Sequence, residues 1–403
     1  MNRVAVAGLA VVALLAGLAV GMFIAGATGT SSTPPANSGL VAVIGSTPPS
    51  TAPTPTASVE PSVAPTPSPT PTPAPTPTPA PTPVLVPAPL TGRLVSPAEA
   101  ARYPIAVMID DLSPARPQSG FSAASVVWQA PAEGGIPRYM LVFQENIPTD
   151  VGPVRSARYY YIAWAAELKA IYAHAGGSPQ ALATLRAQGN GKLVYNADEF
   201  RWGGSFHRIS TRFSPHNLYT SGKSLRGIAK ALGVKDKALK WPWTFAPDPP
   251  LPLRPTGGRI EVAYRANAIR YDYDRKTNSY LRSVTTEKKQ VDAATGQRVA
   301  PKNVVVMLMS FGPLNDGSHK HRLEAKVVGS GTAWIATNGT TIKGTWKKAS
   351  LTAPTRFFDG NGKPVVLTVG QTFVNVMEIG TKVVTVAGKP PLPHSFPPGL
   401  DPR

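Results

Sequence analysis

The chain has 403 residues and no cysteine, which excludes disulfide bonds, thiolate metal sites, cysteine nucleophiles and lipid attachment at a cysteine. Its 45 prolines are clustered, so part of the chain is not globular, while the remainder is long enough to bury a core without cross-links. The net charge of +19 arises entirely after residue 91. Such an excess fits either a solvated basic surface or an anionic partner, such as a polymer, a lipid headgroup or nucleic acid.

The first 27 residues predict a membrane segment. An apolar run from Val4 to Ala27 is longer than the roughly 20 residues that a helix needs to cross a bilayer. Because Arg3 lies on its amino side, we expect a single-pass transmembrane helix with the bulk of the chain extracytoplasmic. The alternative is a signal peptide that is cleaved near Ala27, which would release the protein.

Residues 28–91 predict a linker. They consist mainly of Pro, Thr, Ser and Ala, and proline fixes φ and donates no hydrogen bond. We therefore expect an extended, disordered, polyproline-like segment that buries no core. About 60 residues at ~3.1 Å each would reach roughly 190 Å.

Residues 92–240 predict an α/β domain with a central, mostly parallel sheet. Short apolar runs bounded by Gly and Pro indicate buried strands at 104–111, 124–130, 138–144 and 171–174. Apolar residues at helical spacing indicate a helix within 156–170, which Ser156 would cap. A second helix should follow the N-cap Ser178, with Pro179 in its first turn and Gly189 at its end.

The rest of the chain has a different texture. Residues 241–258 are too rich in proline for a regular element and predict a connector. Residues 259–388 alternate polar and apolar side chains between frequent turn signals, which predicts a second, mainly antiparallel β domain. Residues 389–403 are again proline-rich and predict a loose tail.

The turn between strand 171–174 and the next helix is a candidate anion site. Gly176 and Gly177 can adopt positive φ, and the first turn of the helix after Ser178 leaves N–H groups unpaired. A tight strand-to-helix turn needs glycine and a cap for structural reasons as well, so both interpretations stay open. Ser178 lacks the final glycine of the G-x-S-x-G motif, which speaks against a hydrolase nucleophile.

Two arginines flank the expected start of the first helix, where a cation is unfavourable by up to about 1 kcal/mol. An anion between Arg155 and Arg158 would explain this placement. It could be a bound ligand or an internal carboxylate, such as Glu133 or Asp110.

Other chemistry-bearing side chains stand at expected strand ends and in the expected loop 206–219. Guanidinium groups bind phosphate or carboxylate in a bidentate manner, imidazoles transfer protons near neutral pH, and carboxylates act as bases or hold Mg²⁺, although they also cap turns. The candidate catalytic residues are Asp110, Glu133, His174 and His216. The candidate ligand-binding residues are Arg116, Arg138, Arg155, Arg158, Gly176, Gly177, Ser178, Arg208 and Arg212. His319 and His321 lack a third ligand, so no metal site is predicted, and no cofactor is identified.

Four separated motifs resemble one bacterial family. The stretch from Arg102 to Gln144, "GPVRSAR", "HAGGSPQAL" and "FSPHNLYT" together resemble the YerB-like envelope proteins, a family with a domain of unknown function. The resemblance covers roughly residues 95–235, and residues 259–380 resemble the domain that accompanies it. It implies an extracytoplasmic bacterial protein with two domains and no established reaction. Family members are typically lipoproteins, whereas this chain has no cysteine to carry a lipid.

We therefore expect an envelope protein that binds a phosphate or carboxylate group of an anionic wall polymer or of its lipid-linked precursor. The rival hypothesis is a phosphotransferase or hydrolase that acts on that group. The general layout of this chain, a membrane anchor and an arginine-lined pocket, resembles that of the LytR-CpsA-Psr phosphotransferases. Nucleic-acid binding would fit the charge, but the chain has no recognisable module for it. The sequence does not indicate an oligomeric state.

Overall fold

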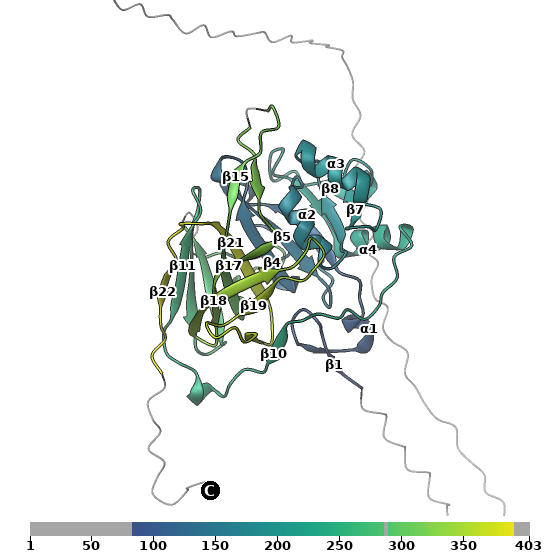
Figure 1. Ribbon diagram of the computed structural model, residues 1–403. Helices are drawn as coiled ribbons and strands as arrows, with labels where there is room; N and C mark the ends of the chain where they lie inside the picture. The colour runs from purple at the N-terminus through teal and green to yellow at the C-terminus, as the bar shows by residue number, and fades with distance from the viewer. Residues whose placement is uncertain (1–82, 286–288, 319, 391–403) are drawn as a thin grey trace, which may run out of the picture. The chain divides into compact units, whose positions relative to one another are not determined.

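The computed structural model describes residues 83–285, 289–318 and 320–390 (Figure 1). The predicted membrane segment, nearly all of the linker and the tail from residue 391 lie outside this part of the chain. No helix within the described residues is long and apolar enough to span a membrane. The described fold begins before the predicted boundary at residue 92, since Leu90 is fully buried in the core.

A ten-stranded sheet forms the centre of the protein. Its strands lie in the order β19-β18-β17-β14-β21-β4-β5-β3-β6-β7. Their bounds are β3 Ile105–Asp110, β4 Val126–Pro131, β5 Pro137–Phe143, β6 Ile171–His174, β7 Tyr195–Asp198, β14 Asn303–Met309, β17 Gly329–Thr337, β18 Thr340–Lys348, β19 Arg356–Phe358 and β21 Thr372–Glu378.

The sheet is mixed, so the prediction of a mostly parallel sheet is wrong. β5 runs antiparallel to β4, because a short turn joins them rather than a crossover helix, and it also runs antiparallel to β3 on its other side. β3, β6 and β7 are parallel to one another, as are β4, β21 and β14. β17, β18 and β19 continue the sheet as antiparallel neighbours.

The sheet contains strands from both predicted domains. β21 lies between β4 and β14, with Thr372 paired to Val126 on one side and to Asn303 on the other. The two segments that flank the predicted connector therefore share one sheet and form one compact unit. The connector itself contains a short strand, β10 (Thr244–Ala246), which pairs in parallel with β20 (Val366–Thr368).

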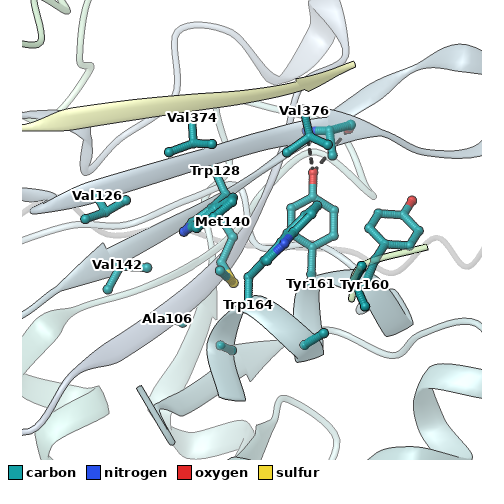
Figure 2. Packing of buried hydrophobic residues seen from close by; sticks show 14 of the residues in the cluster. Ala106, Val126, Trp128, Met140, Val142, Tyr160, Tyr161, Trp164, Val374 and Val376 are labelled. Carbon is teal, nitrogen blue, oxygen red and sulfur yellow. Dashed lines mark hydrogen bonds between the residues drawn. The ribbon is translucent and has the colours of Figure 1, made fainter. Parts of the chain in front are cut away.

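Helices cover one face of the sheet. α2 (Tyr159–Ala166) and α3 (Pro179–Gln188) pack on this face, where the Trp164 ring stacks on Trp128 of β4 at 4.8 Å (Figure 2). The Tyr161 hydroxyl reaches back to the sheet, where it accepts a hydrogen bond from the Ala130 N–H at 2.9 Å. Every residue of α2 after Tyr159 is buried, so a helix with apolar side chains on all sides is stable here.

The opposite face of the sheet packs against a second sheet and one helix. The second sheet is antiparallel, with the order β13-β12-β11-β22, and α4 (Gly222–Ala231) covers the region near β6. The bounds of its strands are β11 Arg259–Ala263, β12 Ala268–Asp274, β13 Ser279–Val284 and β22 Val384–Val386. The predicted antiparallel β structure of the carboxyl-terminal half is present in this sheet and in β17–β19.

The remaining elements are short. Paired strands are β1 (Val86–Pro87) with β2 (Leu94–Val95), β8 (Phe206–Arg208) with β9 (Leu218–Thr220), and β15 (Phe311–Pro313) with β16 (Leu323–Ala325). The short helix α1 spans Pro97–Ala100, and the 3-10 turns are η1 Ser113–Ala115, η2 Phe121–Ala123, η3 Glu133–Gly135, η4 Gly203–Ser205 and η5 Leu251–Leu253.

The caps of the two main helices differ in how well the sequence predicts them. Ser178 caps α3 by accepting a hydrogen bond from the Ala181 N–H, and Gly189 follows its last residue, both as predicted. The prediction of Ser156 as the cap of α2 is wrong: the N-cap is Arg158, and its side chain makes no capping hydrogen bond. Tertiary packing of α2 replaces the local capping signal here.

Candidate functional site

A cleft of about 340 Å³ opens at the end of the sheet where β3 and β4 finish and β5 begins. The turn η3, the segment that follows residue 150 and the loop between β15 and β16 complete its walls. Its lining residues are Asp110, Leu112, Ala132, Glu133, Ile136, Arg138, Arg155 and Lys320. Acidic and basic side chains therefore line the same cleft.

Asp110 joins three segments of the chain at this cleft. It is the last residue of β3, and its side chain is 3% exposed. One carboxylate oxygen accepts from Arg155 Nε at 2.8 Å and lies 2.6 Å from His216 Nδ1, while the other accepts from the Leu112 N–H at 3.1 Å. The Asp110 carboxylate is thus neutralised largely by Arg155, and it fixes the positions of both basic side chains.

Glu133 is the second acid of the cleft, and three arginines share it. Arg138 contacts one carboxylate oxygen at 3.2 Å, and Arg158 and Arg322 both approach the other, Arg322 at 3.7 Å. Glu133 reaches this position from η3, where Gly134 (φ 64°) supplies a left-handed backbone that other residues rarely adopt. One carboxylate cannot neutralise three guanidinium groups.

A further acid neutralises only part of this excess positive charge. Asp316 pairs with Arg322, and its hydrogen bonds from Ser318 and Arg322 lower the pKa of its carboxyl to about 2. Around Asp110, Glu133 and Asp316, three acids in all, lie five lysine and arginine side chains. They are Arg138, Arg155, Arg158, Lys320 and Arg322.

Burial makes this charge excess costly. Burial lowers the pKa of Arg158 to about 10, and it also lowers the pKa of Arg138. The Arg158 side chain is 5% exposed, and neither its Nε nor the Nε of Arg322 has a hydrogen-bond partner among the described residues. A buried guanidinium group with an unused donor is stabilised by an additional anion.

The structure brings together six of the predicted site residues, which come from separate segments of the chain rather than from one short motif. Arg138 and Arg155 line the cleft with both acids, Arg158 touches it through Glu133, and His216 contacts Asp110. Asp110 and Arg138 are direct cross-strand partners in β3 and β5. Asp110, at the end of the predicted strand 104–111, therefore lines the cleft, and its role as a site residue stays a prediction.

Three predicted ligand-binding arginines lie elsewhere. Arg116 forms a buried ion pair with Asp111 at 2.9 Å. Arg212 donates to the backbone carbonyls of residues 115 and 117, and therefore holds its loop in place. Arg208 is exposed and donates to the Asn217 side chain at 2.9 Å. None of them lines the cleft.

The glycine turn is also not part of the cleft. The Gly176 N–H points to the Asp198 carboxylate at 3.4 Å, and the Ser178 N–H donates to the Ala157 carbonyl at 3.2 Å. His174 is fully buried, and its Nδ1 donates to the Gly176 carbonyl at 2.8 Å. The expectation that Gly176, Gly177 and Ser178 offer free backbone donors to the same anion is not met, because internal acceptors occupy those of Gly176 and Ser178.

Sequence reasoning missed Lys320, which lines the cleft, and Arg322, which contacts Glu133 at its wall; both belong to the carboxyl-terminal half. The cluster "HKHR" at 319–322 contains two ordinarily cationic residues, Lys320 and Arg322, beside the histidines that suggest a metal site. Within the described part of the chain, no group of three or more His, Asp or Glu side chains could hold a metal ion. The dense positive charge of this cluster was the available signal, but its distance in sequence from Glu133 hid the contact.

Both halves of the chain match one known family. Residues 90–235 match the N-terminal domain of a protein of unknown function (DUF3048), and residues 260–374 match the C-terminal domain of the same family. The chain belongs to the DUF3048 family. A relative from Bacillus subtilis (strain 168), named "Putative lipoprotein YerB", is 32% identical over 300 residues, which are 72% of this chain and 85% of the relative.

A solved structure supports the fold of this DUF3048 protein. The crystal structure of YerB protein from Bacillus subtilis matches it with a TM-score of 0.66 and 28% sequence identity, over 74% of this chain and 99% of that chain. The resemblance to YerB-like proteins that the motifs indicated is thereby confirmed.

Proposed function

We propose that this protein is an extracytoplasmic component of the bacterial envelope that binds an anionic group, phosphate or carboxylate, in the cleft between Asp110 and Glu133. The name of the Bacillus relative, "Putative lipoprotein YerB", supports the location. The apolar run from Val4 to Ala27 would serve in place of a lipid, since the chain has no cysteine. A wall polymer or its lipid-linked precursor would supply the anion.

The observation that carries this proposal is the sharing of Glu133 by three guanidinium groups. An arginine that serves only the fold is normally matched by its own acceptor, as Arg116 is by Asp111. Arg138, Arg158 and Arg322 converge instead on one carboxylate at the wall of an open cleft. An oxyanion would complete their coordination.

Calorimetric titration of the purified protein with inorganic pyrophosphate tests this proposal. Arg138→Gln should lower the affinity about tenfold, because it removes a charge-assisted hydrogen bond. Arg208→Gln is the matched control, since it removes the same charge from an exposed arginine outside the cleft. Equal affinity of the Arg138 variant and the parent, or the absence of any binding by the parent, would contradict the proposal.

A second candidate function is catalysis on the bound group. His216 Nδ1 lies 2.6 Å from Asp110, and a carboxylate that orients one ring nitrogen leaves the other to act as a general base. Arg155 on the same Asp110 oxygen would position the substrate anion. His216→Gln should then abolish hydrolysis of a phosphate ester such as p-nitrophenyl phosphate, while pyrophosphate still binds. If the parent protein shows no hydrolysis, the cleft is a binding site only.

A further inference from the structure

The outer end of the ten-stranded sheet carries a second feature, separate from the cleft. On one face of β17, β18 and β19, basic and aromatic side chains alternate with small hydroxyl residues. We call this surface the basic–aromatic face. It consists of Ser330, Thr332, Trp334, Lys343, Thr345, Lys347, Arg356 and Phe358. We propose that it binds a linear polyanion whose backbone is a phosphodiester chain without bases.

The strand register shows that these side chains share one face. Lys343 is the direct partner of Trp334, and Lys347 is the direct partner of Arg356. Directly opposed residues in an antiparallel pair project from the same side of the sheet. The intervening residues on the other side, such as Trp346 and Phe357, are buried in the helix-covered core. The basic–aromatic face therefore points away from that core.

The cations on this face have no acidic partner. No carboxylate lies within 4.0 Å of the charged groups of Lys343, Lys347 or Arg356 in the described part of the protein. The adjacent Asp359 accepts instead from backbone N–H groups of its own turn. These three exposed charges are consequently available to an external anion.

The spacing of the cations suits a chain with repeated charges. Lys347 and Arg356 stand side by side on neighbouring strands, which are about 5 Å apart. Lys343 lies four residues along the same strand, which corresponds to about 13 Å. An extended polymer that runs along β18 would meet the Lys347–Arg356 pair first and Lys343 about 13 Å further along.

The aromatic rings favour a polymer without bases. The Lys347 ammonium lies 4.9 Å from the centre of the Phe358 ring, and the Arg356 guanidinium carbon lies 5.2 Å from it. Lys343 covers the Trp334 ring at 5.6 Å. Recognition of single-stranded nucleic acid depends on open ring faces for base stacking. Here the rings hold the cations in place, so the contact offered to a ligand is charge.

Binding of the full chain, in a nonionic detergent, to fluorescently labelled poly(glycerol phosphate) tests the proposal. The triple variant Lys343→Gln, Lys347→Gln, Arg356→Gln should weaken binding, and the slope of log affinity against log salt should fall by roughly 2, which is about 0.7 for each cation. A matched control removes three exposed lysines in and after α4 by Lys223→Gln, Lys230→Gln and Lys237→Gln. Its affinity should equal that of the parent.

The outcomes separate this proposal from the cleft. Retained pyrophosphate binding by the triple variant, together with loss of polymer binding, supports an independent surface. Unchanged polymer binding by the triple variant overturns the proposal. Tighter binding of oligo-deoxythymidine than of the polymer also overturns it in favour of nucleic acid. Binding only to vesicles that contain phosphatidylglycerol overturns it in favour of a lipid surface.

Discussion

A buried ion pair connects the two matched segments, and its disruption is the sharpest test of the shared core. Lys348, the last residue of β18, donates to the Glu167 carboxylate at 2.7 Å, and the two side chains are 0% and 1% exposed. Glu167 follows α2 and also accepts from the Thr355 hydroxyl at 2.6 Å and N–H at 3.0 Å. Burial raises the pKa of Glu167 and lowers the pKa of Lys348, although each charge stabilises the other.

Lys348→Met should lower the free energy of unfolding by about 3–5 kcal/mol, because it leaves the Glu167 carboxylate buried with only the Thr355 donors. The double variant Lys348→Met, Glu167→Leu should recover most of this loss, since no buried charge remains. Urea denaturation followed by tryptophan fluorescence measures both values. The difference between the double variant and the summed single variants gives the coupling energy.

The pH dependence of the Lys348→Met variant provides a second measurement. Without the lysine, the pKa of Glu167 in the folded state lies further above its unfolded value near 4.5. A carboxyl group whose pKa is raised by folding favours the folded state below the unfolded pKa, and this contribution is lost as the pH rises. The destabilisation should therefore be smaller at pH 5 than at pH 8. A loss below about 1 kcal/mol at both pH values would refute a tightly buried pair.

Two further predictions concern a helix cap and the loop beside the cleft. Ser178→Ala should cost about 1 kcal/mol through loss of the α3 cap, whereas Ser178→Thr should cost less in the same urea experiment; equal losses would mean that the hydroxyl does not cap. Asp316 should titrate with a midpoint of about 2 by carboxyl-carbon NMR, since its pKa is lowered by Ser318 and Arg322. The stability it contributes is present above the unfolded value near 3.8 and is lost as the pH falls toward 2. Arg322→Gln should raise the midpoint, and a parent midpoint near 4 would contradict this contact.

Local signals predicted the elements whose structure is determined locally. The strand at 171–174 has the predicted bounds, and α3 lies between the predicted cap and Gly189. The order of strands in the sheet could not be predicted in this way. β21 pairs with β4, but no property of either apolar run specifies the other as its neighbour, because all buried strands present similar side chains. The two-domain expectation rests on the change of composition at 241–258, and the two family matches lie on either side of it, although strands from both sides share one sheet.

In the candidate site, the pairing of acidic with basic side chains could not be predicted from the sequence either. Arg116 and Arg155 are similar in the sequence, since each lies outside the predicted strands in an amino-terminal half rich in arginine. In the structure one forms a closed, buried pair with Asp111, whereas the other borders an open cleft. The sequence contains the number of acids and bases but not their assignment to one another. That assignment depends on which segments the sheet brings together.

This dependence explains why the cleft was predicted in part. The end of β3 identifies Asp110 by a rule that holds for open α/β sheets, since side chains at strand ends border the crevice beside the sheet. Glu133 acquires its significance only when Arg322 arrives from the other half of the chain and brings the number of guanidinium groups around it to three. A single carboxylate with one arginine forms a neutral structural pair. The same carboxylate with three arginines leaves two positive charges that it does not neutralise. The third arginine therefore distinguishes a stabilising contact from a site that attracts a further anion, and Arg322→Gln should weaken pyrophosphate binding although Arg322 does not line the cleft.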